Sequence, residues 1–134
     1  MLNKEGIDKL EAIMLANGKY FYNQRVWASK TDCGTQLCAA GFSLLIEMGD
    51  GAFLYALDSS SKSSFARLCI EAGKKLLGVT TFSQLPQIFD AVSQWPEDLA
   101  RAYDAADAKG QIAVYINMLR TRTNDNGTIN ELED

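Results

Sequence analysis

The sequence predicts an all-α fold, a compact single-domain bundle of five or six helices with an irregular aromatic N-terminal segment. Three observations support this prediction. The chain has 134 residues, which is the length of one ordinary domain. Its apolar residues make up 47% of the total and recur mostly three and four positions apart, as on one face of a helix. No segment alternates apolar and polar residues strongly enough to predict a sheet.

The first helix is predicted over residues 2–16. Ile7, Leu10 and Met14 lie three and four positions apart and therefore share one face. Asn3 is a suitable N-cap, because its side-chain oxygen can accept a hydrogen bond from the first turn. This segment is the clearest amphipathic pattern near the N-terminus.

The next two segments differ in regularity. Residues 19–31 are rich in aromatic side chains without a clean period, so we expect an irregular segment or a short strand pair. Residues 32–48 are predicted to form a helix that Asp32 or Thr35 caps and Gly49 ends. Because this helix is apolar nearly all round, we expect it to be central.

Helical spacing also covers the second half of the chain. Helices are predicted over 64–77, 83–92, 96–106 and 111–122, and residues 50–57 are expected to form one or two helical turns. Gly78 and Gly110 are the expected breaks between helices. The apolar faces predict a core of Cys38, Phe42, Leu45, Leu68, Cys69, Ile88, Phe89, Leu99, Ile112 and Ile116.

The chain is expected to form a single helical domain over residues 1–123. Residues 124–134 contain four acids and no base, so this segment is expected to be an acidic, flexible tail.

Composition excludes several classes of function. With 13 basic and 17 acidic residues the net charge is −4, so we expect no binding to duplex nucleic acid. The absence of histidine removes Ser–His and Cys–His catalytic pairs and histidine metal ligands. The chain lacks the glycine-rich nucleotide fingerprints, and we expect no cofactor. Without a long apolar stretch or an apolar leader, we expect no membrane contact and a cytoplasmic location in a bacterial host.

The chain has three cysteines, Cys33, Cys38 and Cys69. An odd number without metal-ligand spacing predicts reduced, metal-free thiols. Cys33 lies at the expected start of the helix over 32–48, where the helix dipole lowers the pKa of a thiol. A thiol-dependent reaction at Cys33 is therefore one alternative function.

Residues 32–42 read D-C-G-T-Q-L-C-A-A-G-F. This stretch resembles a family of small uncharacterised proteins of bacteriophages, actinobacteria and cyanobacteria that carry the motif C-G-T-x-x-C-x-A-G-W. The similarity spans about residues 27–119, and Phe42 replaces the usual tryptophan. The resemblance implies a helical fold and a phage or mobile-element setting, and it carries no agreed activity. Its other matches are Leu76-Leu77-Gly78-Val79-Thr80, Phe89, Trp95-Pro96 and Tyr103.

A candidate ligand site lies in the same part of the sequence. The expected helix start offers the backbone N–H groups of Cys33, Gly34 and Thr35, which suit an anion. Nearby side chains add positive charge, and Tyr20, Tyr22 and Trp27 offer an aromatic face for stacking. In the alternative interpretation these residues are a helix cap, a loop anchor and solvated cations. The predicted ligand-binding residues are Arg25, Trp27, Lys30, Cys33, Gly34 and Thr35.

Three function classes follow. The leading hypothesis is a non-enzymatic binding protein, encoded by a phage or mobile element, that acts on a host protein or sequesters a small anionic, nucleotide-like ligand. The second is a structural or interaction subunit of a larger assembly, and the third is a thiol-dependent enzyme using Cys33. A sequestering protein should have a ligand-sized pocket with converging polar groups. An interaction subunit should have an exposed apolar patch.

Overall fold

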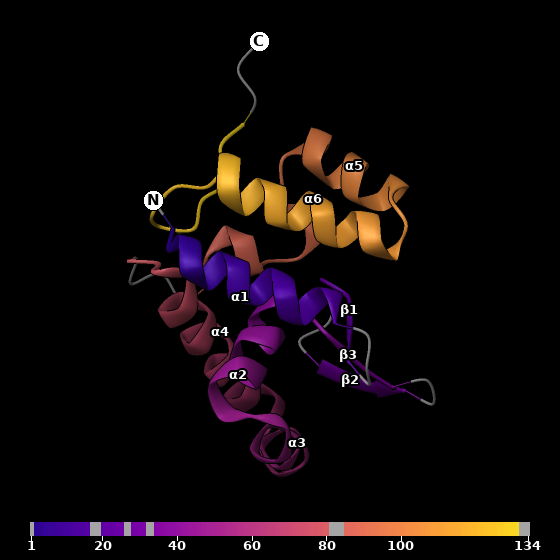
Figure 1. Cartoon of the computed structure of the whole chain (residues 1–134), viewed down its shortest axis with the longest axis vertical. Coiled ribbons are helices and arrows are strands. Elements are labelled where there is room, and N and C mark those ends of the chain that lie inside the picture. The colour runs from indigo at the N-terminus through magenta and orange to yellow at the C-terminus, as the bar shows by residue number, and fades with distance from the viewer. Residues whose placement is uncertain (1, 17–19, 26–27, 32–33, 81–84, 132–134) are drawn as a thin grey trace.

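The computed structural model describes residues 2–16, 20–25, 28–31, 34–80 and 85–131 (Figure 1). These residues form a mostly helical fold, as predicted, with a small three-stranded sheet at one side. The elements in chain order are α1 (Lys4–Leu15), β1 (Tyr20–Tyr22), β2 (Ala28–Thr31), β3 (Gly34–Leu37), α2 (Ala39–Met48), α3 (Asp50–Ser59), α4 (Lys62–Leu77), the 3₁₀ turns η1 (Gln87–Phe89) and η2 (Val92–Gln94), α5 (Glu97–Ala105) and α6 (Ala108–Thr121).

Helix α1 forms where the sequence predicts it. The Asn3 side chain accepts a hydrogen bond from the Glu5 N–H at 3.1 Å, which caps the first turn. Ile7, Leu10 and Met14 are buried along one face, against α2, α4 and α6. The apolar period of the sequence therefore sets both the helix and its orientation.

Two glycines allow close approach to helix α4. A Cβ added at Gly6 of α1 would lie 1.9 Å from the backbone oxygen of Leu76. A Cβ at Gly73 would lie 2.4 Å from the ring of Phe89. Both positions need a residue without a side chain, because α1 and Phe89 pack directly on the α4 backbone.

The predicted helix over 32–48 is wrong in its first part. Residues Gly34–Leu37 form β3, which lies between the other two strands, parallel to β1 and antiparallel to β2. Helix α2 begins at Ala39 instead, and the Cys38 sulfur accepts a hydrogen bond from the Gly41 N–H at 3.4 Å. Pairing with strands on both sides satisfies the backbone hydrogen-bonding groups of β3. This gain outweighs the helical preference of the local sequence.

The predicted helix over 83–92 is also wrong in its described part. Residues 81–84 lie outside the described chain, and η1 and η2 follow as two short 3₁₀ turns. The Ile88 N–H donates to the Gly127 oxygen at 3.1 Å, and the Ile88 oxygen accepts from the Tyr115 hydroxyl at 2.6 Å. These two residues, distant along the chain, supply the hydrogen bonds of the Ile88 backbone. The segment therefore does not need an α-helix to satisfy these polar groups.

Two smaller differences concern helix ends. The short helical segment expected over 50–57 is a full helix, α3. Gly110 does not break a helix but lies inside α6, where its N–H donates to the capping Asp107 side chain at 2.8 Å. An aspartate three residues earlier thus sets the helix start, as N-caps commonly do.

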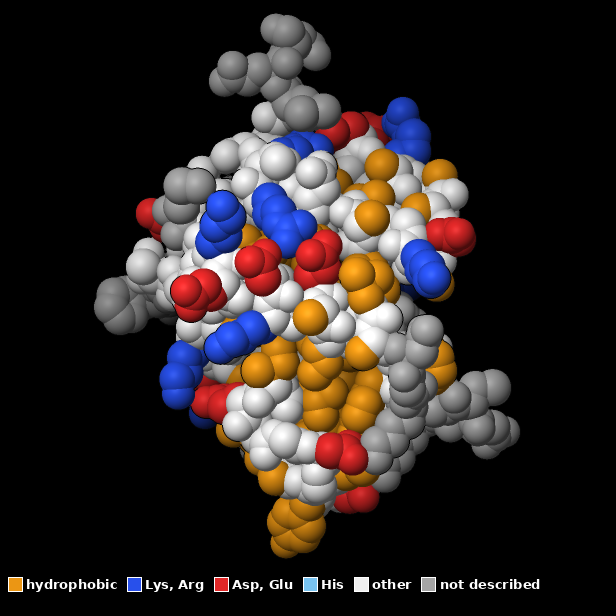
Figure 2. All heavy atoms as spheres, viewed as in Figure 1, with side chains coloured by type: hydrophobic (Ala, Val, Ile, Leu, Met, Phe, Trp, Pro, Cys, Tyr) orange, Lys and Arg blue, Asp and Glu red, His pale blue; other side chains and the backbone are white. Residues whose placement is uncertain are grey.

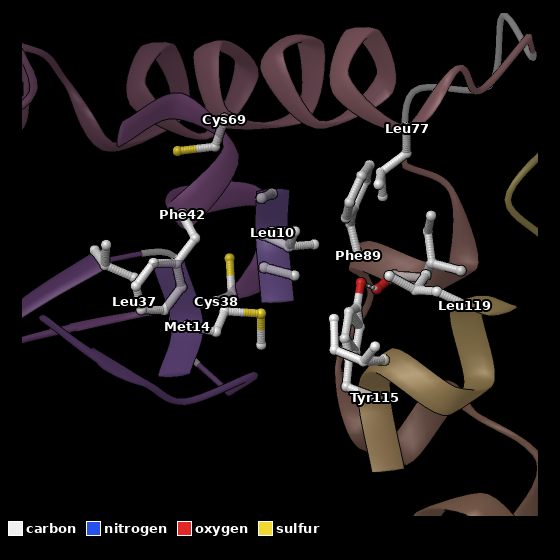
Figure 3. Close-up of a cluster of buried hydrophobic side chains, with 14 of the residues drawn as sticks. Leu10, Met14, Leu37, Cys38, Phe42, Cys69, Leu77, Phe89, Tyr115 and Leu119 are labelled. Atoms are coloured by element: carbon white, nitrogen blue, oxygen red, sulfur yellow. Dashed lines mark hydrogen bonds between the residues drawn. The ribbon is translucent and has the colours of Figure 1, made fainter. Parts of the chain in front are cut away.

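The core lies between α1, α2, α4 and α6 (Figure 3). Every residue predicted for it is buried except Leu68, which is 42% exposed. The buried face of α4 runs through Phe65, Cys69 and Leu77, and Leu68 lies beside it. In Figure 3 the Phe89 ring lies beside Leu77 in the core.

The acidic C-terminal segment is described to residue 131 and packs on η1. The Ile129 N–H donates to the Gln87 side-chain oxygen at 2.7 Å, and the Ile129 side chain is buried. A bridge between Thr123 and Ile129 closes the turn. In the described residues, no helix combines the length and the apolar character that a membrane span requires.

Candidate functional site

Arg25 follows the end of β1 and lies at the surface. Its Nη2 atom is 2.5 Å from Oδ1 of Asp104 on α5, and both side chains are about half-exposed. Its backbone N–H donates to the Asn23 side chain at 3.0 Å. The Arg25 guanidinium, which the sequence analysis expected to bind an anion, therefore already has a carboxylate partner in Asp104.

The other predicted binding residues belong to the sheet or lie outside the described chain. Lys30 pairs with Thr35 across β2 and β3, and Gly34 begins β3. Thr35 is buried. Trp27 and Cys33 are outside the described residues. The expected helix N-terminus is absent at Gly34 and Thr35, because their backbone groups belong to a sheet.

A pocket of about 260 Å³ lies next to Arg25, and we call it the Arg25 pocket. Cys38 at the start of α2 and Phe89 at the end of η1 form its walls. Asp90 also lines it, so the pocket contains an acidic residue as well as the arginine. The full lining is Gln24, Arg25, Cys38, Leu85, Phe89, Asp90 and Ala91.

Gln24 holds this region together, and the sequence analysis did not single it out. It is 3% exposed. Its side-chain oxygen accepts from the Tyr22 hydroxyl at 3.1 Å and from the Ala39 N–H at 3.2 Å. Its amide nitrogen donates to the Asp90 oxygen at 3.3 Å, and its backbone N–H donates to the Tyr103 hydroxyl at 3.2 Å. A buried amide with all these partners is a structural clamp between β1, α2 and α5.

The two described cysteines, Cys38 and Cys69, are buried. Burial raises the pKa of Cys38 to about 11, even though three backbone N–H groups at the helix start lower it. Burial also raises the pKa of Cys69 well above its usual range. Both thiols are therefore protonated near neutral pH and are poor nucleophiles. The described residues contain no cluster of three Cys, Asp or Glu side chains that could hold a metal ion.

Four aromatic rings pack together between the sheet and helices α5 and α6. Tyr22 lies 6.0 Å from Tyr103 and 5.7 Å from Tyr115 between ring centroids. Trp95 packs against the same two tyrosines, at 5.3 and 5.8 Å. The two contacts of Tyr103 are edge-to-face, and such packing contributes to stability beyond the buried area. Tyr22 therefore serves the core rather than a stacking face for a ligand.

Tyr20, the other tyrosine expected to stack on a ligand, is also engaged. Its hydroxyl donates to Oδ1 of Asp50, the first residue of α3. Its ring lies 5.8 Å from Phe53 in an edge-to-face arrangement. The interaction joins β1 to α3, and burial with the neighbouring carboxylate raises the pKa of the Tyr20 hydroxyl.

A second hollow lies next to β1, and we call it the β1 groove. It has a volume of about 110 Å³, and strand β1, the end of α1 and the start of α6 form its walls. Leu15 is 47% exposed and Phe21 is 46% exposed at this site. Figure 2 shows apolar side chains between the end of α1 and the start of α6. The lining is Met14, Leu15, Ala16, Tyr20, Phe21, Tyr22, Ala108, Lys109 and Ile112.

The β1 groove is apolar inside and polar beside it. Lys109 is the one charged side chain among the described residues that line it. On the adjoining surface, Nη2 of Arg120 lies 2.8 Å from Oδ1 of Asp8 and 3.0 Å from Oε1 of Glu11. Leu15 could have been recognised in the sequence, because it lies off the buried face of α1 and is still apolar.

Comparison with protein-family models, with curated proteins and with solved structures finds no match to this chain.

Proposed function

We propose that this chain is a non-enzymatic binding protein that acts on another protein through the β1 groove. The observation that carries the proposal is the pair of half-exposed apolar side chains, Leu15 and Phe21, that line one hollow. Exposed apolar surface with a polar border is typical of protein interaction sites. The resemblance of residues 32–42 to phage proteins supports a host protein as the partner and a cytoplasmic setting.

The volumes of the β1 groove and the Arg25 pocket favour a protein over a small anion as the partner at these two sites. Small-molecule sites usually measure roughly 300–1,000 Å³, whereas the β1 groove measures about 110 Å³ and the Arg25 pocket about 260 Å³. The arginine of the larger pocket is paired with Asp104, and Asp90 adds a second acid. A volume of the β1 groove's size suits a single inserted side chain.

A double variant tests the proposal. Leu15→Gln keeps helix propensity and Phe21→Thr keeps strand propensity, so both remove apolar surface without opposing the local backbone. Tyr55→Gln is the matched control, because Tyr55 is 75% exposed on α3. Proteins captured from a lysate of the bacterial host are compared by quantitative mass spectrometry, and the best candidate is then purified for calorimetry. We expect the double variant to lose affinity by about tenfold or more while the control does not. Equal binding by both variants would contradict the proposal.

The same measurement separates a host-directed binder from a subunit of a larger assembly. An assembly subunit should be recovered with a fixed stoichiometry from its own complex, and native mass spectrometry reports that ratio. A binder of a host protein should exchange and should also exist free in the cell.

A small anionic ligand in the Arg25 pocket is the second candidate function. One observation favours it, since Arg25 does lie on the wall of a pocket that reaches the start of α2. Calorimetry with cyclic and linear nucleotides tests it, on the wild type and on Arg25→Ala/Lys30→Ala. Binding that the double variant loses would support this function, and no heat with any nucleotide would exclude the ligands tested.

A further inference from the structure

We propose that the occupant of the β1 groove is an extended segment of the protein partner, which adds to β1 as a further strand and places an acidic side chain against Lys109. This inference rests on the proposed function, because it names the form and chemistry of the partner.

The backbone of β1 has a side that does not face the sheet. In the order β1-β3-β2, strand β1 lies at the end of the sheet, and β3 is its neighbour among the strands that the structure describes. The Asn23 N–H donates to the Leu37 oxygen of β3 at 2.8 Å. Backbone groups of successive strand residues point alternately to the two sides, so those of Phe21 also face β3 and those of Tyr22 face away. An edge of this kind is a template for another strand.

The groove lies along that outer edge. Side chains of successive strand residues point to opposite faces of a sheet. The β1 groove nevertheless touches three consecutive residues, Tyr20, Phe21 and Tyr22. A hollow that meets all three fits a path along the strand edge, because one face alone presents only alternate side chains. Its other walls, Leu15 on α1 and Ile112 on α6, then flank the path of an added strand.

The lining indicates which side chains the added strand carries. Leu15, Phe21 and Ile112 provide an apolar surface for one inserted side chain, and a volume of about 110 Å³ limits its size. In peptide recognition by strand addition, backbone hydrogen bonds supply affinity and such pockets supply specificity. The partner segment is therefore expected to alternate apolar and polar residues.

Lys109 gives the groove its charge. It lies in the first turn of α6, and none of the described carboxylates is within ion-pair distance of its amine. The other lining residues are uncharged. A lysine beside an apolar hollow favours an acidic side chain in the partner segment, since opposite charges across an interface fix register and exclude other partners.

Selection from a random linear peptide display library tests the inference on the full chain. Peptides are selected on the wild type and counter-selected on Phe21→Thr. We expect an alternating apolar pattern with Asp or Glu at one fixed position. Affinity should fall by about tenfold or more in Lys109→Glu and recover when the peptide's acid is replaced by Lys. Lys62→Glu is the matched control, because Lys62 is an exposed lysine in the first turn of another helix.

Hydrogen exchange of single amides, measured by nuclear magnetic resonance, identifies the binding mode. A bound strand should slow exchange of the Tyr22 amide and leave the Phe21 amide unchanged, because the latter already faces β3. Apolar residues spaced three and four apart in the selected peptides, or an unprotected Tyr22 amide, would overturn strand addition in favour of a bound helix.

Failure of this inference can be told apart from failure of the proposed function. If no peptide is enriched while the Leu15→Gln/Phe21→Thr variant still loses its cellular partner, strand addition is wrong and the binding surface stands. If that variant keeps its partner, both the surface and the strand are wrong.

Discussion

The Arg25 pocket and the β1 groove are lined by neighbouring residues of the same short stretch of chain, and the side chains of their walls have different partners. In the first, the side-chain amide and the backbone N–H of Gln24 bond to the protein itself, and Arg25 pairs with Asp104. In the second, Leu15 and Phe21 remain about half-exposed.

This difference indicates a structural role for the Arg25 pocket and a binding role for the β1 groove. A buried polar group that is fully hydrogen-bonded contributes to stability, and its loss leaves unsatisfied partners. An exposed apolar side chain contributes little to stability and remains available to a partner. Substitutions around the Arg25 pocket should therefore change the free energy of unfolding, and substitutions in the β1 groove should change binding.

The largest effect is expected from Phe89→Ala. Phe89 is buried on the wall of the Arg25 pocket, with its ring against Gly73. Removing it leaves a cavity, so the free energy of unfolding should fall by about 3–5 kcal/mol. Urea denaturation measures the change, with the half-exposed Leu68→Ala as control at less than about 1 kcal/mol. A similar loss in both variants would contradict the assigned burial.

Gln24→Leu should lower the free energy of unfolding by about 2–3 kcal/mol, because the Ala39 N–H and the Tyr22 hydroxyl lose their buried partner. Gln94→Leu, at an exposed position, is the control and should change little. A stabilised Gln24→Leu protein would show that the clamp is dispensable and that the two hollows differ less than their contacts indicate.

Alkaline pH should weaken the same region. The pKa of the Cys38 thiol is raised to about 11 in the folded chain, so the unfolded chain loses this proton first. Stability attributable to Cys38 is therefore complete below about pH 8.5 and decreases as pH rises toward 11, by about 2 kcal/mol at pH 10. Urea midpoints from pH 7 to 10 measure the slope, which should be shallower in Cys38→Ala. An unchanged slope in that variant would assign the effect to other groups.

Phe21→Thr should have the smallest effect on stability, within about 0.5 kcal/mol, because the ring is half-exposed. The same substitution should reduce partner binding by about tenfold or more. Thermal unfolding and calorimetry on one preparation compare the two quantities. A large loss of stability with unchanged binding would reverse the roles assigned to the two hollows.

Part of the site could be predicted from the sequence, and the missing part has a physical reason. Arg25 was identified by its charge, and it does lie on a pocket wall. Its partner Asp104 could not be identified, because the two residues are far apart in sequence and meet only when α5 packs beside β1. Leu15 and Phe21 are ordinary apolar residues, and their exposure depends on what covers them.

Sequence periodicity by itself determined α1, α4, α5 and α6, because an amphipathic helix carries its apolar face in local spacing. Residues 34–37, in contrast, form a strand because of tertiary contacts. Thr35 and Leu37 lie in a segment that the sequence predicts to be helical. In the structure they pair with Tyr20 and Tyr22 on one side and with β2 on the other. Strands this short have too few residues for a periodic pattern, so their backbone partners, distant along the chain, determine the structure.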